Sequence, residues 1–142
     1  MKILALDIGI KRIGIAKWNQ NENEGIVLPL QLVQYQKPGE GLAEILNIID
    51  VEKPSALVLG YPLGTNGKTG EMTRLVDRWR SKLGELTNLK VHLCDERMTS
   101  RLATQNLSRL GVKQQKRKAA IDMAAAVLIL ETWLHSHNFL NR

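Results

Sequence analysis

The sequence has 142 residues and a mass of 16.0 kDa, the size of one domain, and its core must be mostly aliphatic because 44% of the residues are hydrophobic but only 4% are aromatic. A formal net charge of +6 favours an anionic partner, with nucleic acid ahead of a membrane surface. The single Cys94 excludes an internal disulfide and a cysteine-based zinc cluster and fits a reducing cytoplasm, and we expect neither a signal segment nor a membrane span.

The chain opens with an apolar run that leads into an acidic residue. Residues 3–6 are Ile-Leu-Ala-Leu, Asp7 follows, and residues 13–16 are apolar again. This pattern predicts two adjacent antiparallel strands in the centre of a sheet that is covered on both faces. A carboxylate at the end of such a strand is costly unless it is paired, hydrogen-bonded or bound to a metal. With Lys11 and Arg12 nearby, the stretch fits either a metal or phosphate site or an aspartate that stabilises a hairpin turn.

The remaining elements follow from apolar periodicity and turn signals. In order, the sequence predicts a strand over 26–35, a helix with apolar residues at 42, 45, 46 and 49, a buried strand over 56–60, a helix over 72–83, a strand over 90–94, a helix that begins near 99–100 and ends at 111, and a last helix over 118–134. A strand–helix–strand unit implies parallel pairing of its strands. We therefore expect one α/β domain over residues 1–142, built on a mixed five-stranded sheet flanked by helices.

The glycine-rich loop over residues 61–70 contains Gly67-Lys68-Thr69, which is similar to the end of a nucleotide-binding P-loop. That motif needs its first glycine at position 62, where this chain has Pro62. The P-loop interpretation is therefore excluded. A loop that covers a substrate and an inert surface loop both stay open.

Carboxylates occur at three places where an apolar strand or helix ends: Asp7, Asp95-Glu96 and Asp122. Sites in open α/β sheets form at the carboxyl ends of strands, so the first two can share one edge. Carboxylates brought together repel one another unless a cation neutralises them, and oxygen ligands favour Mg²⁺ or Mn²⁺. Two such ions about 4 Å apart would suit hydrolysis of a phosphodiester.

Asp122 is expected in the first turns of the last helix. A carboxylate there could simply complement the positive end of the helix dipole. The flanking Ile121 and the small Ala125 and Ala126 favour instead a buried position close to the strand ends.

Basic residues connect the second and third acidic positions. Arg97, Arg101, Arg109, Lys113, Lys116, Arg117 and Lys118 follow one another with no acidic residue between them. Such a run is often just a solvated face, but here it joins elements of the proposed site. Together with Lys11 and Arg12 it is expected to contact the phosphate backbone. Sequence readout looks weak, because no exposed aromatic residues for base stacking are evident.

These motifs together resemble the YqgF/RuvX family of Holliday-junction resolvases, which are also described as pre-16S ribosomal RNA nucleases. The matching segments are residues 6–16, residues 58–62 with the glycine loop, residues 95–100, and residues 118–122 with 124–130. Ile10 and Met98 depart from residues common in the family, away from the proposed chemistry.

The resemblance implies an RNase H-like fold, metal-dependent nuclease activity and a role in maturing small-subunit ribosomal RNA. By position, Asp7 is the acid of the first strand, Asp95 or Glu96 that of the fifth, and Asp122 that of the helix. The related resolvase RuvC carries a further acid on its fourth strand, where this chain has Leu59-Gly60-Tyr61. Its site therefore cannot be copied here, although branched DNA stays an alternative substrate.

Two other functions compete with the nuclease. The Asp7-x-Gly9 turn is also similar to the phosphate-binding turn of sugar kinases and Hsp70-like ATPases, but those enzymes close two such domains on ATP. The third possibility is a non-catalytic nucleic-acid-binding module. We expect a cytoplasmic protein that acts as a monomer or a homodimer.

Overall fold

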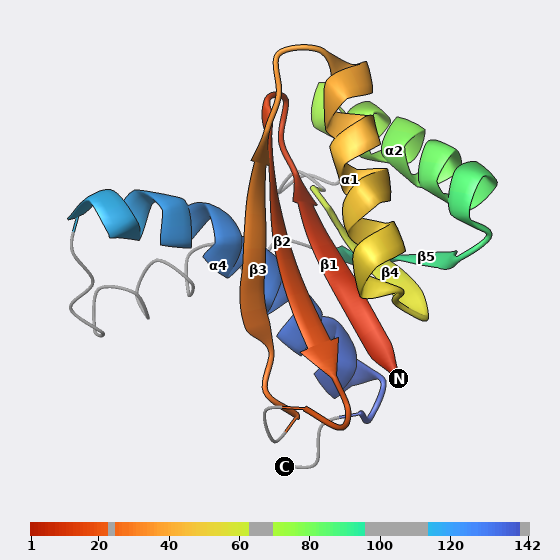
Figure 1. Ribbon diagram of the computed structural model, residues 1–142, viewed down its shortest axis with the longest axis vertical. Coiled ribbons are helices and arrows are strands. Elements are labelled where there is room, and N and C mark those ends of the chain that lie inside the picture. Colours follow the sequence, from red (N-terminus) through yellow and green to blue (C-terminus); the bar gives the residue numbers. More distant parts are fainter. Residues whose placement is uncertain (23–24, 63–69, 96–113, 140–142) are drawn as a thin grey trace.

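Five strands form one mixed sheet in the order β3-β2-β1-β4-β5 (Figure 1). The computed structural model describes residues 1–22, 25–62, 70–95 and 114–139, with the backbone alone for 114–122. The strands are β1 (Lys2–Ile8), β2 (Arg12–Asn19), β3 (Leu28–Gln34), β4 (Ala56–Tyr61) and β5 (Lys90–Asp95). β2 lies antiparallel between β1 and β3, and β4 lies parallel between β1 and β5. The predicted mixed sheet and the central position of the first strand are confirmed.

Three helices cover the sheet. In Figure 1, α1 (Pro38–Glu52) and α2 (Glu71–Thr87) lie on one face, and α4 (Gln114–Ser136) crosses the other. All three contain the apolar residues from which the sequence predicted them. The helix predicted between residues 99 and 111 and most of the glycine loop lie outside the described residues.

Strand alternation divides the core into two layers. On β1, the even-numbered Leu4, Leu6 and Ile8 are buried towards α1 and α2, in a cluster that includes Trp79. The odd-numbered Ile3 and Ala5 are buried towards α4. The central strand is apolar on both faces because helices cover both faces.

Trp79 of α2 is 6% exposed and belongs to the core, as its helical spacing predicted. The predicted burial of α4 is confirmed along one side only. Ala126, Ile129, Leu130, Trp133 and Leu134 are buried, whereas Ala124, Ala125, Val127 and Leu128 are half-buried. A nearly all-apolar helix can therefore lie on one sheet face because its small alanines expose little apolar surface. No described helix is both long and apolar enough to span a bilayer.

Candidate active site at the carboxyl edge of the sheet

Four strands end at the same edge of the sheet, towards which β1 and β3 point upward in Figure 1. β1, β4 and β5 are mutually parallel. β3 runs in the same direction, because β1 and β3 are each antiparallel to β2. Across this edge the strand order places the end of β3 on one side, β1 in the middle and β5 on the other side. This is the edge at which open α/β sheets bind ligands.

Asp7 lies in the middle of this edge. It is the penultimate residue of β1 and is half-buried. Because it lies two residues after Ala5, it is on the same face of the sheet, the one that α4 covers. Its partner on β2 is Gly14, and the register with β4, which pairs Leu6 with Leu59, continues from Asp7 to Gly60. Both glycines are buried. Gly14 pairs with Asp7 on one side, and on the other Gly60 follows the last paired residue of β4, so both strand positions beside the carboxylate lack a side chain.

Asp95 lies on the opposite face of the sheet from Asp7. It is the last residue of β5, and it pairs with Tyr61 on β4. Both residues lie on the α1 and α2 face of the sheet. Leu93, two residues before Asp95, and Tyr61 itself pack in that layer, while Cys94 between Leu93 and Asp95 is buried towards α4. Asp7 and Asp95 thus share an edge, as predicted, but the sheet separates their side chains.

Tyr61 occupies the α2 side of the edge. Its hydroxyl donates a hydrogen bond to Oδ2 of Asp77 in α2, at 3.3 Å. Desolvation and then the negative charge of Asp77 raise the pKa of Tyr61, so the phenol stays protonated. Tyr61 thereby ties the end of β4 to α2 on the face opposite Asp7.

The helix that carries Asp122 begins earlier than the sequence predicted. α4 starts at Gln114 rather than Lys118, because the preceding glutamines and cations are good helix formers. Asp122 is therefore not in the first turns, where the dipole of the helix acts, and the expectation of that position was wrong. Asp122 precedes Ala126 by one helical turn, and Ala126 is the first buried residue among the described side chains of α4, which begin at Met123.

The predicted phosphate-binding residues divide into three groups. Lys11 and Arg12 are exposed at the β1–β2 turn. Lys116, Arg117 and Lys118 belong to α4, of which only the backbone is described at this point. Arg97, Arg101, Arg109 and Lys113 lie outside the described residues, as does Glu96. Among the side chains that are described, no three acidic, histidine or cysteine groups come together as a metal site.

The turn beside Asp7 is held by backbone contacts. The N–H of Gly9 donates to the carbonyl of Arg12 at 2.7 Å, and a Cβ on Gly9 would lie 2.7 Å from the same oxygen. The hydroxyl of Tyr35 donates to the carbonyl of Gly9 at 2.8 Å. Burial raises the pKa of Tyr35, which keeps this donor protonated. The turn that carries Lys11 and Arg12 is thus fixed to the end of β3.

A polar hollow of about 360 Å³ opens next to this turn. It is lined by Lys11, Arg12, Gln34, Tyr35, Gln36 and Glu40. Sequence reasoning missed Gln34, Gln36 and Glu40, although the alternation of exposed glutamines with buried Val33 and Tyr35 was a usable signal. It also missed Gly14 and Gly60, which become neighbours of Asp7 only when the strands pair.

Comparison with known proteins agrees with this architecture. The family model described as "RuvX: Holliday junction resolvase" matches residues 1–136. A protein of Maridesulfovibrio salexigens named "Putative pre-16S rRNA nuclease" is 35% identical over 134 residues, which are 94% of this chain and 98% of that protein.

Two solved structures share the fold at much lower identity. The fowlpox virus resolvase in complex with its substrate Holliday junction DNA aligns with a TM-score of 0.63 and 13% identity, over 96% of this chain and 99% of that one. RuvC of Thermus thermophilus aligns with a TM-score of 0.61 and 13% identity, over 97% of both chains. These likenesses confirm the expected RNase H-like fold. Since the family model spans almost the whole length and the bacterial relative is similar from end to end, this chain belongs to the RuvX family of Holliday junction resolvases.

Proposed function

We propose that the chain is a metal-dependent nuclease that hydrolyses phosphodiester bonds in structured nucleic acid, with the precursor of 16S ribosomal RNA as its substrate. The observation that carries the proposal is the half-buried Asp7, which stands between Gly14 and Gly60 at the carboxyl edge of the sheet. The name of the Maridesulfovibrio relative supports the substrate, and the net charge of +6 suits a polyanion. The protein would act in the cytoplasm, as a monomer or a homodimer.

The acids proposed to act with Asp7 are Glu96 and Asp122. Asp95 lies on the α1 and α2 face of the sheet, whereas Asp7 lies on the α4 face. Since Asp95 faces away from Asp7, Glu96 is the acid of this pair that we propose as the partner of Asp7. Asp122 is favoured because it precedes the buried Ala126 of α4 by one helical turn.

This set of carboxylate oxygens fits Mg²⁺ or Mn²⁺, which prefer such ligands. When bound, the ions would activate a water molecule and stabilise the charge on the leaving oxygen. Gly14 and Gly60 would let the scissile phosphate approach Asp7 without a side chain in the way. Lys11, Arg12 and the basic residues from Arg97 to Lys118 would hold the flanking phosphates.

A four-way DNA junction is the alternative substrate. The fold shared with the fowlpox virus resolvase and with RuvC favours it. Against it, β4 has Leu59-Gly60-Tyr61, with no acid where the related resolvase RuvC carries one.

The test is a cleavage assay on precursor 16S RNA and on a four-way DNA junction, each with Mg²⁺, Mn²⁺ or EDTA. We expect metal-dependent cleavage of the RNA, and loss of at least a hundredfold in rate for Asp7→Asn, because a ligand charge is removed from the transition state. RNA binding and the melting temperature of Asp7→Asn should stay close to those of the wild type.

The two neighbouring acids provide the matched comparison. Glu96→Gln should abolish cleavage as Asp7→Asn does, whereas Asp95→Asn should retain most of the activity. If Asp95→Asn is inactive and Glu96→Gln active, the assignment of Glu96 is wrong. If Asp7→Asn cleaves at the wild-type rate, the nuclease site is not at this edge.

A further inference from the structure

The polar hollow beside the β1–β2 turn has the composition of a nucleotide site rather than of a simple anion site. Lys11 and Arg12 provide cationic donors, Gln34 and Gln36 provide amides that both donate and accept, and Glu40 provides an acceptor. A carboxylate would repel a phosphate that was bound alone. It would accept a hydrogen bond from the amino group of a nucleobase.

Four polar side chains of the hollow are available to a ligand. The side chains of Lys11, Gln34, Gln36 and Glu40 are exposed, and none of these four forms a hydrogen bond or ion pair with another residue that the structure describes. The backbone beneath them is fixed, since the N–H of Tyr35 donates to the carbonyl of Lys11 at 3.0 Å and the Tyr35 hydroxyl binds Gly9. The backbone of the hollow is therefore preset, and the conformational cost of binding is limited to ordering its exposed side chains.

The hollow lies at the edge that also carries Asp7. Gln34 ends β3 and pairs with Arg12, the first residue of β2, while Asp7 lies near the end of β1. Strands β3 and β1 are separated by β2 alone. Two strand spacings of roughly 4.8 Å put the end of β3 about 10 Å from Asp7 along the edge. That distance corresponds to roughly three stacked nucleotides. The hollow beside the end of β3 is lined by Tyr35 and Glu40 and so lies towards α1, whereas Asp7 lies on the α4 face.

We propose that this hollow binds one unstacked nucleotide of the substrate, within about three residues of the cleaved bond, and prefers a base that carries an amino group. Lys11 and Arg12 hold the phosphate of this nucleotide. Gln34, Gln36 and Glu40 read the edge of its base, as glutamine does for adenine and glutamate for cytosine. Because uracil has no exocyclic amino group, it is the base that the hollow rejects. The proposal rests on the proposed nuclease function and adds a point of sequence selection to it.

The experiment measures binding without cleavage. Short single-stranded RNAs that differ at one position, with cytosine, adenine or uracil, are titrated against the Asp7→Asn protein in a fluorescence anisotropy assay. We expect one position at which uracil weakens binding about tenfold. Gln34→Ala and Glu40→Ala, each in the Asp7→Asn background, should remove this preference, because each truncation removes the group that would read the base.

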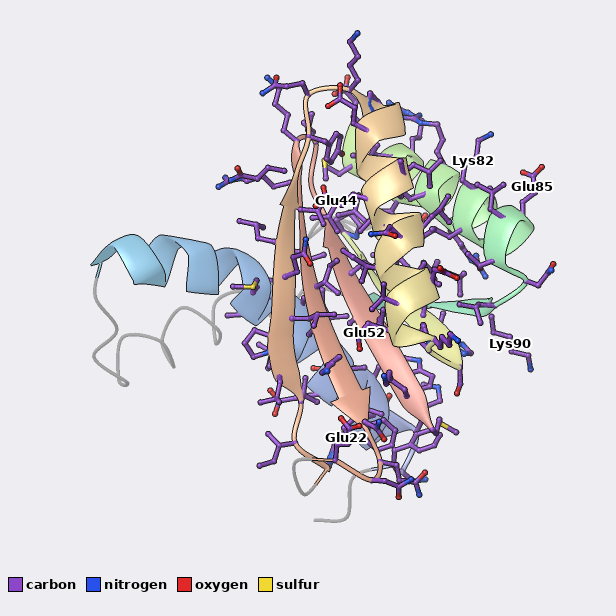
Figure 2. The ribbon with its side chains drawn as sticks, in the orientation of Figure 1. Glu22, Glu44, Glu52, Lys82, Glu85 and Lys90 are labelled. Carbon is purple, nitrogen blue, oxygen red and sulfur yellow. The ribbon has the colours of Figure 1, made fainter. Side chains whose placement is uncertain are left out.

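The control variant is Glu44→Gln, on the same helix as Glu40. Glu44 accepts a hydrogen bond from Gln31 at 3.2 Å and lies outside the hollow (Figure 2). Glu44→Gln makes the same change of charge and should keep the preference. Equal binding of all RNAs by the Asp7→Asn protein, or a preference that survives both hollow variants, would overturn the nucleotide site. Neither result bears on the nuclease function, which fails only if the wild type does not cleave.

Discussion

Gly9 is required by a contact rather than by an unusual backbone angle. A Cβ at this position would meet the carbonyl oxygen of Arg12 at 2.7 Å, and that oxygen is fixed because it accepts the Gly9 N–H. Backbone cannot move aside as a flexible side chain can. The residue thereby determines where the turn places Lys11 and Arg12 relative to Asp7.

Gly9→Ala should destabilise the protein by roughly 1–3 kcal/mol, because the turn must open to admit the methyl group. Chemical denaturation measures the free energy of unfolding. Gly39→Ala is the control, since a Cβ there has open space within 4 Å and alanine is the better helix former. Equal stability of Gly9→Ala and the wild type would show that the turn can admit a Cβ beside the carbonyl of Arg12.

His92 gives stability a dependence on pH. Its ring lies 4.8 Å from that of Trp133, and the ring of Trp133 also lies 4.2 Å from that of His137. Desolvation, and then the charges of His137, Lys90 and Arg80, lower the pKa of His92 below its ordinary value of 6.5. The folded protein therefore favours the neutral ring, and the unfolded chain takes up the proton first as the pH falls.

The contribution of His92 is complete above pH 6.5 and is lost as the pH falls from there towards the lower pKa of the folded state. His92→Phe retains a ring against Trp133 and removes the titration. We expect the wild type to lose stability more steeply than this variant as the pH falls below 6.5. The exposed His135→Gln should follow the wild type, and parallel curves for His92→Phe and the wild type would refute the role of His92.

At the scale of elements, α1 is attached to the sheet at its carboxyl end. The Nζ of Lys2 lies 3.3 Å from Oε1 of Glu52 and also donates to the Glu52 carbonyl at 2.8 Å. The Nζ of Lys17 lies 3.6 Å from the same carboxylate oxygen. Glu52 thus joins the last turn of the helix to β1 and β2, on the lower part of the sheet in Figure 2.

Glu52→Gln should lower the free energy of unfolding by about 1 kcal/mol at low salt, since one carboxylate serves two partly buried cations. The loss should shrink as salt screens the wild-type pair. Urea denaturation at two salt concentrations measures both effects. Glu85→Gln is the control, because Glu85 lies on the outer side of α2 in Figure 2 and is exposed. A loss as large in Glu85→Gln would mean that the pairing of Glu52 is irrelevant.

At the scale of the whole molecule, the positive charge should act as a phosphate-binding surface. The exposed Lys11 and Arg12 lie at the carboxyl edge, and Lys116, Arg117 and Lys118 belong to the amino-terminal part of α4. In Figure 1 this part of α4 extends beyond β3, outside the area of the sheet. Because this part of the helix extends past the sheet, we expect it to meet a long substrate.

Neutralising Lys116 or Arg117 should weaken binding of unrelated RNAs by similar factors and reduce the slope of log affinity against log salt by about one. The measurement is a salt titration of binding. Lys53→Asn is the control, because Lys53 caps α1 away from the carboxyl edge with φ of 52°, a conformation that asparagine tolerates. An unchanged slope for both helix variants would leave these cations as a solvated face.

Over the residues that the structure describes, the sequence alone determined the elements and their order, because burial on one or both faces imposes a local spacing of apolar residues. It also determined that Asp7 ends a central strand, since that run is apolar on both sides. Only the boundaries shifted, as at Gln114, where good helix formers extend α4.

Only the tertiary structure decided which groups face one another. Whether Asp95 shares the face of Asp7 depends on the register across β4, and one residue of slip would reverse it. The glycines around Asp7 and the hollow beneath Gln34 likewise combine residues from separate strands and from α1. Periodicity describes one segment at a time, whereas a site is made where segments meet, and that meeting is fixed by packing between residues far apart in the chain.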